Sequence, residues 1–140
     1  RFKLYVDYQG QSQLVWSSNV VLDITLPQSD IDDALNNVTF QNVLVSSIHG
    51  EAWDNTTSGL ERYQVEFGSG VSPSVWTSIA TVSSNPVYSG GKLINWVLDS
   101  TDDSAASVAN GQYTLRLTVE DKAGNISQDT VLVNVDNFIT

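Results

Sequence analysis

The chain of 140 residues contains no cysteine, which excludes a disulfide framework and any thiol chemistry. Basic residues are also scarce, with 6 Lys and Arg against 16 Asp and Glu, and the formal net charge is -10. Because nucleic-acid binding draws on clustered Lys and Arg, we expect no nucleic-acid partner. No apolar run approaches the roughly 18 residues that a spanning helix needs, so we also expect no membrane span.

The residue patterns of common enzymes are missing as well. The one histidine, His49, lies in an apparent strand without a sequence partner for a catalytic dyad, and we interpret it as a surface or sheet-edge residue. The chain has no G-x-S-x-G elbow, H-E-x-x-H motif, Walker loop or dinucleotide fingerprint. The pairs Asp32-Asp33 and Asp102-Asp103 lie in polar stretches, which favours a solvated surface. We therefore expect a protein that is not an enzyme.

What is present is typical of a globular domain. The hydrophobic fraction is 41%, with 4 Trp, 5 Tyr and 4 Phe. A chain of this length buries about two-thirds of its surface on folding, which is enough for a core without covalent cross-links. Because the chain begins with Arg1 and has no Met, we expect a processed mature protein or a piece of a longer one.

The clearest secondary-structure signal lies in residues 111–135. Apolar residues alternate with polar ones over 113–120, which predicts a half-buried strand. Asp121 to Asn125 supply the Gly and Asn that a tight reversal needs, so a hairpin is predicted, with a second arm over 129–135. The residues expected to face the core are Tyr113, Leu115, Leu117 and Val119.

This stretch resembles the last two strands of bacterial and archaeal immunoglobulin-like or fibronectin-III-like modules. The matching pattern is G-x-Y-x-L-x-L-x-V-x-D-x-x-G-N, followed by a strand that ends in V-D-N. Such modules occur in large secreted and cell-surface proteins. Residues 48–54 (I-H-G-E-A-W-D) resemble the first strand of these modules, and the middle strands match in order. The resemblance covers residues 41–137 and departs between 99 and 110, where a longer acidic loop replaces a short turn.

The resemblance implies an all-β fold, an immunoglobulin-like antiparallel β-sandwich with additional N-terminal strands. We predict two parts: an N-terminal extension over residues 1–40 and the sandwich over 41–140. Within the extension we expect strands over 1–8, 13–17 and 20–26, with Ile24 and Leu26 facing inward until Pro27 ends the ladder. A single helical turn capped by Ser29 or Asp30 is expected within 30–37. Further strands are expected over 42–53, 60–67, 75–82 and 92–98.

Oxygen-bearing residues near the expected loops suggest a calcium site, since Ca²⁺ takes six to eight oxygen ligands. Loops at one pole of a sandwich converge in space, as in cadherin-like modules that bind Ca²⁺ between domains. No single loop carries the D-x-D-x-D-G pattern, and the alternative is that these residues cap turns. The candidate ligands are Glu51, Asp54, Asp121, Asn125 and Asp136, and we expect Asp54, Asp121 and Asp136 to meet.

Three N-x-[ST] sequons occur, at Asn37, Asn55 and Asn125, and each is a hypothesis for glycosylation. Of the tryptophans, we expect Trp53, Trp76 and Trp96 to pack in the core. Trp16 either packs on the extra strands or stacks on a sugar ring.

Residues 1–8 form an amphipathic segment that we interpret as an assembly strand. Its apolar residues, which a groove would bury, are Phe2, Leu4, Val6 and Tyr8. Adding this strand to the sheet edge of another copy would build a filament, while folding back onto its own sandwich is the alternative.

We therefore predict a non-catalytic structural or adhesive module, extracellular or at the cell surface, that associates with itself or with neighbouring domains. The alternative is a carbohydrate-binding or other ligand-binding accessory module of a secreted hydrolase.

Overall fold

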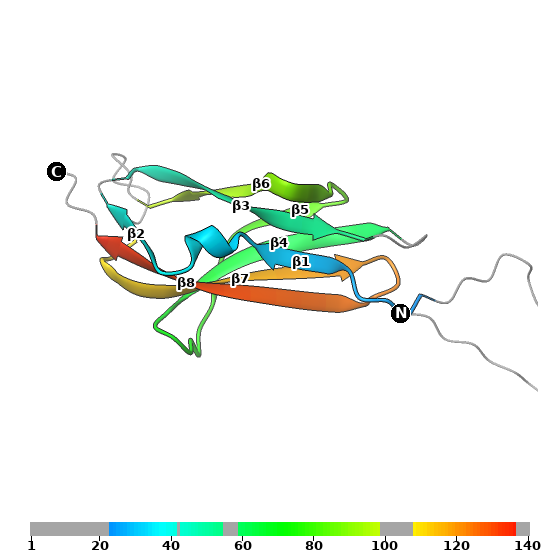
Figure 1. The fold of residues 1–140 in the computed structure, drawn as a ribbon. Helices are drawn as coiled ribbons and strands as arrows, with labels where there is room; N and C mark the ends of the chain where they lie inside the picture. Colours follow the sequence, from blue (N-terminus) through cyan, green and yellow to red (C-terminus); the bar gives the residue numbers. More distant parts are fainter. Residues whose placement is uncertain (1–22, 42, 55–58, 99–107, 137–140) are drawn as a thin grey trace, which may run out of the picture.

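The structure is a computed structural model that describes residues 23–41, 43–54, 59–98 and 108–136 (Figure 1). Its elements in chain order are β1 (Gln28–Ile31), the 3-10 helix η1 (Asp33–Leu35), β2 (Val38–Gln41), β3 (Val45–Trp53), β4 (Leu60–Ser69), β5 (Thr77–Ser83), β6 (Val87–Val97), β7 (Gly111–Asp121) and β8 (Ile126–Asp136). The predictions at residues 1–22, 42, 55–58, 99–107 and 137–140 lie outside the described residues.

The strands form two sheets packed face to face, so the prediction of an all-β sandwich is confirmed. One sheet has the order β1-β3-β6, and the other has the order β2-β8-β7-β4-β5. Within the described chain every pairing is antiparallel except that of β2 with β8, which is parallel. The apolar inner faces of the two sheets fill the space between them and form the core.

The predicted hairpin is confirmed as β7 and β8, and its register places the expected face inward. Leu115, Leu117 and Val119 are fully buried, and Tyr113 packs against the core. The turn uses Gly124 at φ 91°, a left-handed conformation that favours glycine. Thr114 is also buried, although it lies on the expected polar face. Its hydroxyl donates to the Gly70 carbonyl at 2.6 Å, so the chain after β4 covers this part of the outer face.

The N-terminal predictions need correction. Residues 23–26 form no strand, and the side chains of Ile24 and Leu26 are 77% and 61% exposed, so the predicted inward orientation is wrong. The first described strand is β1, which begins only after Pro27. The helical turn exists, but its cap is Asp32, whose side chain accepts from the Ala34 amide at 3.0 Å. The predicted caps, Ser29 and Asp30, lie in β1 instead, too far back along the chain to occupy the N-cap position.

β1 and β2 tie the incoming chain to both sheets. β1 pairs with β3, and β2 pairs with β8, the last strand of the other sheet. β1 precedes the predicted boundary at residue 40, and β2 spans it. The division into two parts stays a prediction.

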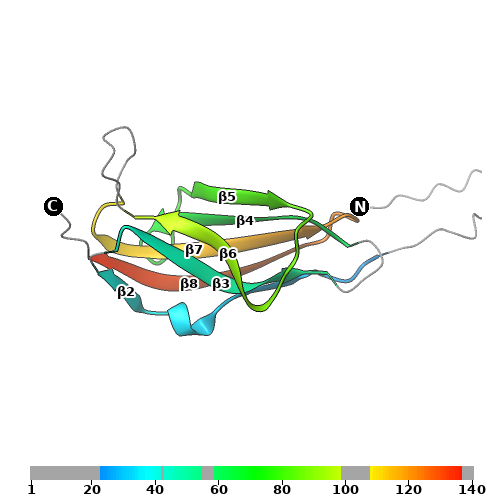
Figure 2. The ribbon, with the colours of Figure 1, turned by 90° about the horizontal axis from the view of Figure 1, so that it is seen from above.

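The two lateral sides of the sandwich differ (Figure 2). On one side β1 lies against β7 and β8, and the Ile31 amide donates to Asp129 Oδ2 at 2.7 Å, which links the two sheets. On the other side lie β5 and β6, the outermost strands of their respective sheets. We call the latter the β5/β6 side.

Candidate functional site

Three aspartates meet at the end of the sandwich where the described chain begins, which we call the N-terminal pole. Asp54 follows β3, Asp121 ends β7, and Asp23 lies in the segment before β1. One carboxylate oxygen from each lies within 4.8 Å of the others, and Asp121 is only 1% exposed. Ionised carboxylates at this spacing repel one another, and a cation among them would offset that repulsion.

Asn125 connects this acidic cluster to the β7–β8 turn. Its backbone amide donates to Asp121 Oδ1 at 2.8 Å, and its Nδ2 donates to Asp121 Oδ2 at 3.0 Å. The same Nδ2 also donates to the Asp23 carbonyl at 2.9 Å. Nearby, the Ser127 hydroxyl donates to the Pro27 carbonyl at 2.7 Å. These bonds fix the incoming segment against the hairpin.

The structure brings together only some of the predicted calcium ligands. Asp54 and Asp121 meet as expected, and Asn125 binds Asp121 directly. Asp136 ends β8 at the opposite pole, ten residues or about 33 Å along the strand from Ile126, so its predicted meeting with the other two is wrong. Antiparallel pairing of β7 with β8 dictates this separation. Calcium binding itself stays a prediction.

Asp23 completes the cluster and is not among the predicted ligands. No motif in the sequence marks it, since the alternation of residues before Pro27 favours a strand there. Its neighbourhood with Asp54 and Asp121 arises from contacts between residues about 30 and 100 positions apart, as the Asn125–Asp23 bond illustrates. Only the tertiary structure reveals such proximity.

Glu51 lies in a second acidic group on the side where β1 covers the sandwich. It is directly opposite Asp30 in the β1–β3 register, and Asp129 of β8 lies close by. Burial raises the pKa of the Asp30 carboxyl above its ordinary value, and the charges of Asp129, Asp33 and Glu51 raise it further. The Asp30 carboxyl is therefore protonated more readily than an exposed carboxyl.

Two of the three sequons lie among described residues. Asn37 is exposed, with φ 65°, and its backbone amide donates to the Leu132 carbonyl at 2.7 Å. Asn125 is half-buried, and a glycan on Nδ2 would displace at least one of that atom's two hydrogen bonds. Glycosylation stays a prediction at both positions, and the geometry accommodates it better at Asn37.

The prediction that three tryptophans lie in the core is confirmed for Trp96, which is 2% exposed, and is wrong for Trp53 and Trp76, which lie outside the buried core. Trp76 is half-buried beneath the Arg116 guanidinium, whose Cζ lies 3.9 Å from the ring centroid. Trp53 is half-buried beside the exposed Tyr88, with their planes tilted by 42°. This pair does not present the flat surface on which a sugar ring stacks, so the carbohydrate hypothesis gains no support from it. His49 is exposed in β3, as expected.

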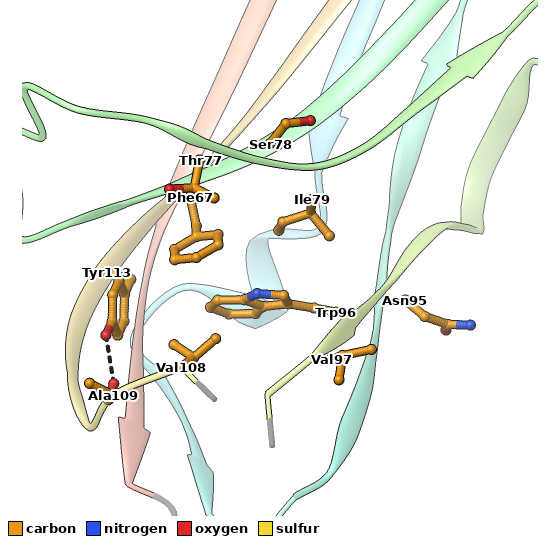
Figure 3. A pocket seen from close by; sticks show the side chains of 10 residues that line it. All are labelled: Phe67, Thr77, Ser78, Ile79, Asn95, Trp96, Val97, Val108, Ala109 and Tyr113. Carbon is orange, nitrogen blue, oxygen red and sulfur yellow. Dashed lines mark hydrogen bonds between the residues drawn. The ribbon is translucent and has the colours of Figure 1, made fainter. Parts of the chain in front are cut away.

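A cavity of about 390 Å³ opens on the β5/β6 side, and we call it the lateral pocket (Figure 3). Its size is at the lower end of the ~300–1,000 Å³ range typical of ligand pockets. The rings of Phe67, Trp96 and Tyr113 pack against one another there in tilted and edge-to-face arrangements, with centroids 5.3 to 6.3 Å apart. The remaining lining residues are Thr77, Ser78, Ile79, Asn95, Val97, Val108 and Ala109.

The three rings of the pocket come from β4, β6 and β7, and further contacts fix two of them. Trp96 also packs edge-on against Phe40 at 5.9 Å, and the Tyr113 hydroxyl donates to the Ala109 carbonyl at 2.6 Å (Figure 3). Among the described lining residues, Thr77, Ser78 and Asn95 carry exposed polar side chains. The arrangement suits an apolar side chain or ring, and no sequence signal beyond the aromatic content points to it.

Comparison with known proteins gives no relative: no protein-family model matches the chain, and no curated protein matches it either. Among the described residues, no helix has the length and apolar character to cross a membrane.

Proposed function

We propose that the chain is a non-catalytic structural module of an extracellular or cell-surface protein, with an immunoglobulin-like sandwich that transmits force along its long axis. The immunoglobulin-like assignment is supported by the two-sheet strand order, in which β1 belongs to one sheet and β2 to the other. Strand order alone does not define an activity, whereas the way in which the first and last described segments are held bears directly on a mechanical role.

The observation that carries the proposal is the parallel pairing of β2 with β8. Their register runs from Val38 opposite Val133 to Gln41 opposite Asp136. The described chain begins at one pole and β8 ends at the other (Figure 1). Because β2 and β8 are parallel, both strands run from the first pole toward the second. Pulling the two ends apart therefore slides β2 along β8 and loads their hydrogen bonds together.

The hydrogen bonds at the N-terminal pole add to this attachment. Asn125 and Ser127 hold the carbonyls of Asp23 and Pro27 before β1 begins. The Asp129 carboxylate then holds the Ile31 amide within β1. Force from the N-terminal direction thus meets several side-chain anchors on β8 and its turn before it reaches β2.

Single-molecule pulling in two geometries tests this proposal. Since the chain lacks cysteine, handles can be attached through introduced pairs. Thr25→Cys with Asp136→Cys loads β2 and β8 in shear, whereas Gln41→Cys with Asp136→Cys opens their adjacent ends one bond at a time. We expect a clearly higher unfolding force in the shear geometry, with both variants equally stable in urea.

Equal forces in the two geometries would overturn the proposed load-bearing role. The comparison is matched because both variants share Asp136→Cys and differ only in the position of the second handle.

A further inference from the structure

We infer that the gap between β5 and β6 is an acceptor site for residues 1–8 of a second copy of this chain, which pair with the open edge of β5. The inference rests on the proposed structural function and specifies how modules of this kind would join. Such a site needs an unpaired edge, an apolar lining, a matching segment and a reason for a second copy.

β5 is an edge strand with little of the usual protection. It pairs with β4 on one side, and no described strand pairs with its other side. Natural edge strands are commonly protected by charged residues, proline or bulges that point the edge away from partners. The β5 sequence, T-S-I-A-T-V-S, contains neither charge nor proline. Its one protective feature is a bulge at Ile79, which lies between the pairs Val65–Ala80 and Glu66–Ser78.

Apolar side chains of β5 and β6 line part of the gap. Ile79, Ala80 and Val82 of β5 and Val87 of β6 are half-buried and pack against the core. At the end of the gap away from Val87, the lateral pocket adds its three aromatic rings. Side chains that enter from an added strand would therefore meet apolar atoms, with the deepest space at the pocket.

Residues 1–8, the N-terminal segment, match this gap in pattern and length. From Phe2 to Tyr8 four large apolar residues alternate over six residue steps, and a strand of six steps spans about 20 Å. The seven residues of β5, also six steps, span about the same length. Residues 1–8 contain two of the chain's 6 basic residues and one Asp, whereas the whole chain has a net charge of -10. Attraction between the segment and an acidic sandwich therefore favours their encounter.

The arrangement of the sheets favours a partner copy over the segment's own sandwich. β1 and β2, which continue the N-terminal segment, lie on the side opposite β5 and β6 (Figure 2). Insertion of residues 1–8 of one copy into the acceptor of the next would be a head-to-tail contact, which leaves a free donor and a free acceptor at the two ends and propagates into an open filament.

Complementation between two defective variants tests this site. Deletion of residues 1–8 leaves an acceptor without a donor, and Val97→Asp in the half-exposed wall of the lateral pocket leaves a donor without an acceptor. We expect the parent chain to polymerise at high concentration, each variant alone to stay monomeric, and an equimolar mixture to form 1:1 dimers in analytical ultracentrifugation. Val75→Asp is the matched control, since Val75 is exposed outside the pocket, and it should polymerise like the parent chain.

The second acceptor variant, Ile79→Asp, protects the test against a local effect of Val97→Asp, and melting curves establish that all variants fold. Polymerisation of both acceptor variants, with loss of polymers only on deletion, would place the acceptor elsewhere. Polymers from the deleted chain, or a parent chain that stays monomeric with its segment in its own gap, would also overturn the inference. The pulling experiment applies force between residues 25 and 136 and does not load residues 1–8. Failure of the acceptor site is therefore distinguishable from failure of the load-bearing role.

Discussion

The phenol of Tyr63 makes a hydrogen bond that crosses the sandwich, and its removal should measurably destabilise the fold. Tyr63, on β4, is 2% exposed and donates to the Leu93 carbonyl of β6 at 2.6 Å. A register shift between Ile48 and His49 leaves Leu93 without a cross-strand partner in β3. The hydroxyl thus binds a buried carbonyl at an irregular point of the opposite sheet.

Tyr63→Phe keeps the ring and removes only this donor. A buried acceptor that loses its partner costs about 1–3 kcal/mol of folding free energy. In a domain of this size that loss lowers the melting temperature by about 3–12 °C. Tyr88→Phe is the matched control, because Tyr88 is 63% exposed and its variant should change stability by less than about 0.5 kcal/mol.

The pH dependence provides a second measurement on the same residue. Burial raises the pKa of the Tyr63 phenol above its ordinary value of 10.0. Because the folded pKa is the higher one, the stabilisation is fully present below pH 10.0 and is lost as the pH rises through the folded pKa. The difference between the parent chain and Tyr63→Phe should therefore shrink in alkali. Equal urea midpoints for the two Tyr→Phe variants at pH 7 would refute the proposed role of the phenol.

Two further predictions concern the acidic groups. If Ca²⁺ binds at the N-terminal pole with the ~10⁻⁴–10⁻³ M affinity of extracellular modules, about 10 mM calcium should stabilise the fold by about 1.4–2.7 kcal/mol. Asp54→Asn should weaken this response, and a melting temperature identical in calcium and chelator would remove the idea. Asp30→Asn should stabilise the fold by about 0.2–1 kcal/mol at pH 7, because like charges oppose each other across the strands. Since the folded pKa of Asp30 is raised above 3.8, this gain should shrink as the pH falls through the folded pKa and be absent below pH 3.8. A gain independent of pH would contradict charge repulsion as its cause.

The sequence determined the elements whose signals are local. Strict alternation placed Leu115, Leu117 and Val119 in the core, because a strand turns every second side chain to the same face. The Gly and Asn of residues 121–125 likewise determined the turn, since the required backbone angles depend on those residues themselves.

The tertiary structure decided everything that depends on which strands are neighbours. The parallel pairing of β2 with β8 joins residues about 95 positions apart, and no local pattern specifies it. The same applies to Asp23 beside Asp54 and Asp121, and to the separation of Asp136 from them by the length of β8. The lateral pocket depends on it too, because its rings come from β4, β6 and β7 and meet only where the two sheets pack at their open side. Side-chain periodicity determines which face of a strand is apolar, but the packing of the whole chain determines what that face meets.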